Sequence, residues 1–102
     1  PYGGYARTAT LLKKFRAQDP NPIFLNAGDI FQGTLYFNVY EGMADLAVLN
    51  AIRPDAVALG NHEFDRGLPT LARFCAGANF PLLSANLDLS REPKLKDVVK
   101  PH

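Results

Sequence analysis

The sequence contains a single cysteine, Cys75, so it cannot form an internal disulfide or a cysteine-based zinc site. It also has no apolar run near the ~20 residues that a membrane-spanning helix needs. Eleven Lys and Arg residues against ten Asp and Glu residues leave a net charge of +1. Without an excess of basic residues there is no general attraction to nucleic acid or to an anionic membrane. These absences exclude classes of partner but identify none.

The remaining composition suits one globular domain over residues 1–102. Apolar residues make up 47% of the chain and charged residues 21%, as in ordinary folded proteins. The first residues, Pro1-Tyr2-Gly3-Gly4, include neither an initiating methionine nor a charged-then-apolar signal region. We therefore expect the chain to be part of a longer polypeptide.

Three segments place apolar residues at helical spacing. The first helix is expected from Tyr5 to Gln18, where the prolines of residues 19–22 end it, and the second from about Gly42 to Arg53. The third contains Leu68 and ends near Gly77. The aromatic segment 31–40 is consistent with a loop that packs on the core or with an early start of the second helix.

Three short apolar runs predict strands that are buried on both faces, as in a parallel sheet. These runs are Ile23–Ala27, Ala56–Leu59 and Pro81–Ala85. Helices alternate with these strands and no hairpin signal occurs, so each strand can cross over to a parallel neighbour. The predicted fold class is α/β, a layered parallel sheet with crossover helices. The tail from Asp88 to His102 is charged and weakly patterned.

Polar residues follow the three predicted strands. Asp29 comes after the first strand, Asn61 and His62 after the second, and Asn86 after the third. Ligands of parallel α/β sheets bind beyond the carboxyl ends of the strands. Carboxylate and amide oxygens can bind divalent cations, and an imidazole can donate a proton to a leaving oxygen. This set is typical of metal-assisted hydrolysis.

Other kinds of active site find less support in the sequence. Ser84 falls within a predicted strand, Cys75 lies on the apolar face of a helix, and neither has an evident base partner. The chain also lacks the glycine-rich phosphate-loop motifs.

These motifs identify a resemblance to a known family. The pair Gly28-Asp29, followed by the block from Gly60 to Glu63, resembles the calcineurin-like metallophosphoesterases, and Asp65 narrows the likeness to their 5′-nucleotidase branch. The agreement extends to about Leu87. It includes these flanking segments: Gly3 to Arg7, Gln32-Gly33-Thr34, and Leu83 to Asn86.

The resemblance implies a partial metallophosphoesterase domain with two divalent metal ions, zinc in the first place and manganese or magnesium as alternatives. Asp29 is then the ligand that bridges both ions and Asn61 binds one of them. His62 is the catalytic histidine, and Asp65 orients its imidazole. The implied substrate is a nucleoside 5′-monophosphate, and the implied location is extracellular, cell-surface or periplasmic.

Several parts of the family pattern are missing from the sequence. They are the opening Asp-x-His block, the later metal-binding histidines and the carboxy-terminal nucleotide-binding domain. We therefore expect the isolated 102 residues to be inactive without the remainder of the parent chain. Two alternatives stay open. One is a relative that acts on nucleoside di- or triphosphates, nucleotide sugars or cyclic nucleotides, and the other is a non-catalytic truncated module.

Simpler structural roles are also open for the polar residues. Asp29 and Asn61 are residue types common in turns, although their motif context favours a site. Asp65 stands just ahead of the third helix and could cap it. Glu63 is expected to be a local structural acceptor and not a metal ligand. Asn86 suits a strand-end turn as well as a site.

Overall fold

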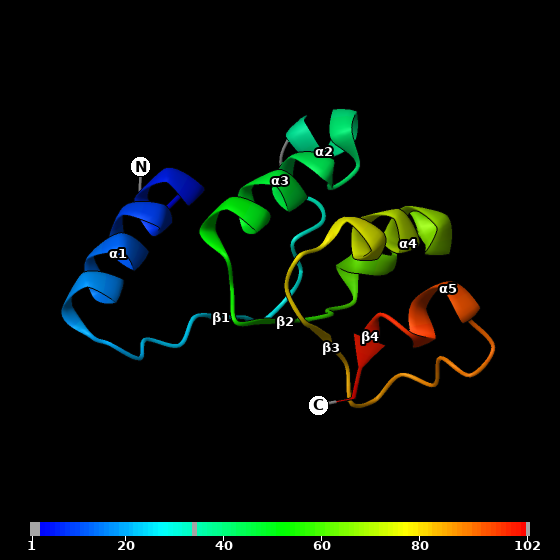
Figure 1. Ribbon diagram of the computed structural model, residues 1–102. Coiled ribbons are helices and arrows are strands. Elements are labelled where there is room, and N and C mark those ends of the chain that lie inside the picture. The colour runs from blue at the N-terminus through cyan, green and yellow to red at the C-terminus, as the bar shows by residue number, and fades with distance from the viewer. Residues whose placement is uncertain (1–2, 34, 102) are drawn as a thin grey trace.

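The computed structural model describes residues 3–33 and 35–101 (Figure 1). Thr34 of the Gln32-Gly33-Thr34 flank and His102 of the tail lie outside the described residues. The helices are α1 (Tyr5–Gln18), α2 (Leu35–Tyr40), α3 (Met43–Ile52), α4 (Gly67–Gly77) and α5 (Pro93–Lys96), with the 3₁₀ helix η1 (His62–Phe64). The strands are β1 (Leu25–Asn26), β2 (Ala56–Ala58), β3 (Leu82–Leu83) and β4 (Val99–Lys100).

The strands form a four-stranded parallel sheet in the order β1-β2-β3-β4, which confirms the predicted fold class. Val57 lies opposite Leu82, and Leu82 lies opposite Val99. These three side chains are buried, whereas the neighbouring Ala58 and Lys100 are exposed. Figure 1 shows α3 and α4 on the same side of the sheet. The core therefore lies between the helices and one face of the sheet.

The prediction that the strands are buried on both faces is wrong for β1 and for β2, in which Ala58 is exposed. β1 has two residues, and Leu25 is 66% exposed. The physical reason is that α3 and α4 cover one face of the sheet, whereas Leu25 and Ala58 lie on the opposite face from the buried Val57. The apolar side of α1 is only partly covered: Ala9 and Leu12 pack against the core, but Phe15 is 56% exposed and α1 has no fully buried residue.

Polar contacts attach α1 to the rest of the domain. The Arg16 guanidinium donates to the backbone oxygens of Ile52 and Arg53, at 2.8 and 2.6 Å. These carbonyls lie at the end of α3, where a cation is favourable. No helix of the described residues is long and apolar enough to cross a membrane.

The aromatic segment 31–40 contains a separate helix, α2, and is neither a loop nor the first turn of α3. The positive φ angles of Glu41 (50°) and Gly42 (84°) divide the two helices. Phe31 and Phe37 are buried with ring centroids 5.0 Å apart, as expected for packing residues. Tyr36, by contrast, is 68% exposed. Of the four aromatic residues in this segment, Phe31 and Phe37 therefore pack in the core, whereas Tyr36 and Tyr40 are exposed.

The tail contains regular structure that its weak pattern did not predict. α5 buries Leu95, and β4 buries Val99 while it extends the sheet. Each element has a single buried residue, which is too little for a periodicity signal. The third strand is shorter than predicted, so Ser84 lies just beyond β3, where its backbone N–H donates to the Lys100 carbonyl at 2.8 Å. Lys94, Lys96 and Lys100 of this charged tail are exposed.

Candidate functional site

The loop after β1 approaches the loop after β2 very closely. Gly28 adopts φ +85°, and a Cβ atom at this position would lie 2.5 Å from the Ala58 oxygen and 2.6 Å from the Gly60 nitrogen. No side chain fits into such a space, so glycine is required here. Asp29 follows with φ +52°, also in the left-handed region. This turn carries the Asp29 side chain to the segment that begins at Gly60.

Asp29 contacts that segment directly. Its Oδ1 accepts the backbone N–H of His62 at 3.1 Å. A Cβ atom on Gly60 would collide with the same carboxylate oxygen. The structure thus brings Asp29 together with the segment that carries Asn61 and His62, at the carboxyl ends of β1 and β2.

A buried carboxylate joins the two loops beneath this contact. Glu63 is fully buried and accepts four backbone N–H groups, from Asp29, Ile30, Phe31 and Gly60, at 2.5–3.3 Å. The expectation that Glu63 is a structural acceptor is confirmed. The sequence did not predict that these hydrogen bonds join distant segments: three of the four donors lie more than 30 residues away in the sequence. No local pattern signals such a contact.

His62 and Asp65 form a hydrogen-bonded pair at the surface of the site. The His62 Nδ1 atom lies 2.7 Å from Asp65 Oδ2, and Gln32 Nε2 donates to the same oxygen at 2.9 Å. The Asp65 hydrogen bond and its negative charge raise the pKa of His62 above its ordinary value. The His62 hydrogen bond, followed by that of Gln32, lowers the pKa of Asp65. An imidazole held by a carboxylate in this way retains its proton more strongly.

The structure does not support the alternative that Asp65 caps α4. The residue that caps α4 is Arg66, and no side-chain capping bond is present there. Asp65 instead contacts His62 and Gln32. The sequence pattern does not predict the role of Gln32, because no periodicity places this residue near Asp65, which follows 33 residues later.

The two asparagines line a hollow of about 500 Å³ beyond β2 and β3. Asn61 and Asn86 are exposed there, and Phe64 contributes an apolar wall. The Ser84 hydroxyl donates to the Asn86 Oδ1 atom at 3.1 Å. The hollow therefore offers amide groups beside the Asp29 loop, in a space large enough for a small ligand.

The donor set matches only part of a divalent metal site. Asp29 and Asn61 place hard oxygen ligands at one edge of the sheet, the ligand type that divalent cations accept. Within residues 3–33 and 35–101, however, no group of three or more His, Cys, Asp or Glu side chains could hold a metal ion. A catalytic ion normally takes at least three protein ligands. The described residues do not complete such a site.

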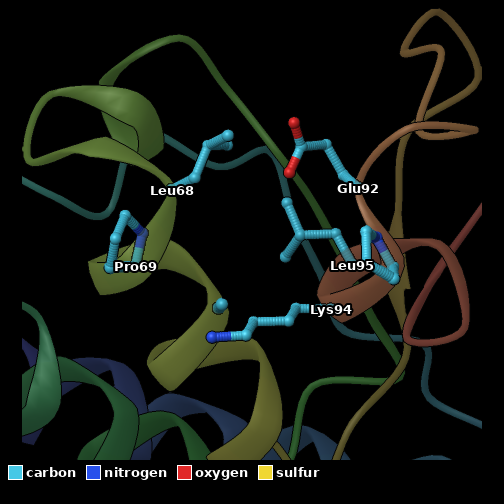
Figure 2. A pocket seen from close by; sticks show the side chains of 7 residues that line it. Leu68, Pro69, Glu92, Lys94 and Leu95 are labelled. Carbon is cyan, nitrogen blue, oxygen red and sulfur yellow. The ribbon is translucent and has the colours of Figure 1, made fainter.

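A second hollow, of about 260 Å³, lies between α4 and α5. Figure 2 shows Leu68 and Pro69 of α4 on one side and Leu95 of α5 on the other. Its lining is mainly apolar and includes none of the predicted site residues. We therefore place the candidate site at the carboxyl ends of β1 and β2, near Asp29 and His62.

Comparisons with known proteins identify the family of the chain. The family model described as Calcineurin-like phosphoesterase matches residues 1–97. The chain is 48% identical over 95 residues to Protein 5NUC of Lutzomyia longipalpis, 48% over 87 residues to the snake venom 5′-nucleotidase of Crotalus adamanteus, and 48% over 86 residues to the 5′-nucleotidase of Homo sapiens. These matches cover 92%, 84% and 83% of the chain but only 17%, 15% and 15% of the relatives.

Solved structures show the same relationship. The 5′-nucleotidase precursor from Thermus thermophilus superimposes with a TM-score of 0.94 and 53% identity, over 99% of this chain and 20% of that one. The NAD nucleotidase of Haemophilus influenzae follows with a TM-score of 0.87 and 42% identity, over 97% of this chain and 20% of that one. The chain thus spans about a fifth or less of these relatives. It belongs to the calcineurin-like phosphoesterase family, and the predicted resemblance to the 5′-nucleotidase branch is confirmed.

Proposed function

We propose that residues 1–102 form part of the catalytic domain of a metal-dependent 5′-nucleotidase, which hydrolyses nucleoside 5′-monophosphates to nucleoside and phosphate. The observation that carries this proposal is the His62–Asp65 pair, at 2.7 Å, directly beside the Asp29 carboxylate. A proton donor next to an anionic metal ligand suits phosphate ester hydrolysis.

Each residue has a distinct role in the proposal. Asp29 and Asn61 contribute oxygen ligands for two divalent ions, and other parts of the polypeptide supply the remaining ligands. When bound, such ions neutralise phosphate charge and activate water. His62 is the acid: Asp65 holds its Nδ1 atom, so Nε2 is the nitrogen that protonates the departing nucleoside oxygen. Zinc is the first metal to test, with manganese and magnesium as alternatives.

The location and the partners of the protein are proposals as well. Relatives found in snake venom support an extracellular, cell-surface or periplasmic location. The relatives are at least five times longer than the matched region, which supports cooperation with further domains of one polypeptide.

A second candidate is a phosphoesterase with a different nucleotide substrate. The NAD nucleotidase of Haemophilus influenzae is 42% identical to this chain, and a Bacillus subtilis relative is named a trifunctional nucleotide phosphoesterase. Proteins that are similar to this chain in sequence are thus named for other nucleotide substrates. A non-catalytic module remains the third candidate, because the described residues do not complete a metal site.

The test uses the full polypeptide that the gene encodes, supplied with Zn²⁺ or Mn²⁺. We expect phosphate release from AMP, with smaller rates for ADP, NAD and cyclic AMP. His62→Ala should lower kcat by about 10²–10⁴-fold, the usual contribution of a general acid. Residues 1–102 expressed alone should release no phosphate above background. A faster reaction with NAD than with AMP would favour the second candidate, and no turnover of any nucleotide would favour the module.

A further inference from the structure

We infer that Glu63 is a positioning residue of this site: its buried carboxylate holds the loop of residues 29–32 against Gly60 and thereby determines where Asp29 and His62 meet. The inference rests on the proposed function. It assigns to Glu63 no contact with metal or substrate, and it states that the site geometry depends on the four hydrogen bonds that Glu63 accepts.

The bonding pattern uses the whole carboxylate. Oε1 accepts the N–H groups of Ile30 and Phe31, at 2.5 and 3.3 Å, and Oε2 accepts those of Asp29 and Gly60, at 3.0 and 2.7 Å. Hydrogen bonds to an ionised acceptor are stronger than neutral ones. A fully buried carboxylate is tolerated because such donors replace its water shell. Two oxygens with two donors each require an acceptor-only group, so a neutral amide cannot reproduce the pattern.

The loop that Glu63 binds is in an unusual conformation. Asp29 (φ 52°) and Gln32 (φ 78°) are both left-handed, although neither is glycine. Such conformations persist only where the surroundings hold them, and they occur preferentially at functional sites. Three backbone N–H groups of this loop donate to Glu63. One belongs to Asp29, and the other two belong to Ile30 and Phe31, which lie between Asp29 and Gln32.

Both ends of the loop contact functional groups. At one end the Asp29 carboxylate accepts the His62 N–H, and at the other the Gln32 amide donates to Asp65. Glu63 itself lies in η1, next to His62. A single buried carboxylate therefore connects the proposed metal ligand, the proposed acid and the residue that orients the acid.

The first variant is Glu63→Gln in the full polypeptide, and its main readout is Mn²⁺ affinity measured by titration calorimetry without substrate. The variant keeps the shape of the side chain but places an NH₂ group against backbone donors. We expect Mn²⁺ binding to weaken about 10–100-fold, the usual effect of removing a residue that orients metal ligands. The kcat for AMP should fall by a similar factor, while the KM changes by less than about threefold.

The control variant Leu49→Ala distinguishes this inference from a purely structural role for Glu63. Leu49 is fully buried in α3 and makes no hydrogen bond to the backbone of the loop, so its truncation lowers stability while the Glu63 hydrogen bonds stay available. Both variants are compared at a temperature where both are folded. If Glu63→Gln weakens Mn²⁺ binding no more than Leu49→Ala does, the inference is overturned.

Amide hydrogen exchange provides a second measurement that does not depend on the variant's folding. In the wild-type protein the N–H groups of Ile30 and Phe31 should exchange at least about 100-fold more slowly than exposed loop amides, since they are bonded to a buried acceptor. Exchange as fast as in an exposed loop would overturn the inference. This result is independent of catalysis, because a wild-type protein that hydrolyses no nucleotide would overturn only the proposed function.

Discussion

The Nδ1 atom of His62 lies 2.7 Å from Oδ2 of Asp65, one short 3₁₀ turn further along the chain. The pair raises the pKa of His62 and lowers that of Asp65, in each case chiefly through this hydrogen bond. The folded state thus binds the His62 proton more tightly than the unfolded chain, whose histidine pKa is about 6.5. The stabilising contribution of His62 is fully present below about pH 6.5 and is lost as the pH rises through the folded pKa.

The stabilising contribution of Asp65 depends on pH in the opposite direction. Its folded pKa lies below the unfolded value of about 3.9, so its contribution is present above about pH 4 and is lost as the pH falls through the folded pKa. The pair is therefore strongest between about pH 4 and pH 6.5.

The first prediction concerns Asp65→Asn. Because this variant replaces the charged carboxylate acceptor by a neutral, weaker amide acceptor, protonated His62 is favoured less and the pKa of His62 should fall. The measurement is a proton NMR titration of the imidazole resonances, with His102→Gln used to assign them, since the sequence has two histidines. Asp19→Asn is the matched control, because Asp19 accepts an N–H from Asn21 near the end of α1 and makes no contact with His62. An unchanged His62 pKa in Asp65→Asn would contradict the pairing.

The second prediction compares two glycines with similar backbone angles. Gly28 (φ +85°) faces the Ala58 oxygen, whereas Gly33 (φ +90°) has open space where a Cβ would lie. Gly33→Ala should lower the unfolding free energy by about 1–2 kcal/mol, because alanine disfavours the left-handed conformation. Gly28→Ala should cost about 1–3 kcal/mol more, because the methyl group displaces a neighbouring strand end. Urea denaturation measures the difference, and equal losses would show that the two loops do not approach closely.

The third prediction concerns Cys75, the single thiol. It is 1% exposed on α4, and burial raises its pKa to about 11. Only thiolates react rapidly with disulfide reagents. At pH 8 the native protein should therefore react with Ellman's reagent at least about 100-fold more slowly than the same protein in urea. Comparable rates in the two conditions would place Cys75 at the surface.

The fourth prediction concerns the exposed apolar residues of α2. Leu35 is 81% exposed and Val39 is 71% exposed. Apolar patches of this kind favour association, so residues 1–102 expressed alone should self-associate at micromolar concentration. Leu35→Glu should shift the population toward monomer in sedimentation velocity. Asn38→Glu adds the same charge on the same helix without removing an apolar group, and it should have a smaller effect. A monomeric wild-type polypeptide with a sharp two-state melt would contradict the prediction.

Helix positions were the part of the fold that local pattern predicted best. α1, α3 and α4 begin and end within about one residue of the expected positions, because proline and glycine act on the backbone locally. The short elements α5 and β4 were missed, since one buried residue in each produces no periodicity. The predicted burial of β1 and β2 on both faces was wrong, because whether helices cover one face of a sheet or both depends on how the connections pack, which a single segment does not specify.

The candidate site was likewise predictable only in part. Residue order alone placed Asp29, Asn61 and His62 after predicted strands, because parallel strands bring their carboxyl ends to one edge of a sheet. The tertiary structure decided the contacts of Glu63 with Ile30 and of Gln32 with Asp65, both across more than 30 residues. Such contacts depend on how two loops meet after the sheet has formed. Local sequence determines which side chains are available, and only packing between distant segments determines which of them touch.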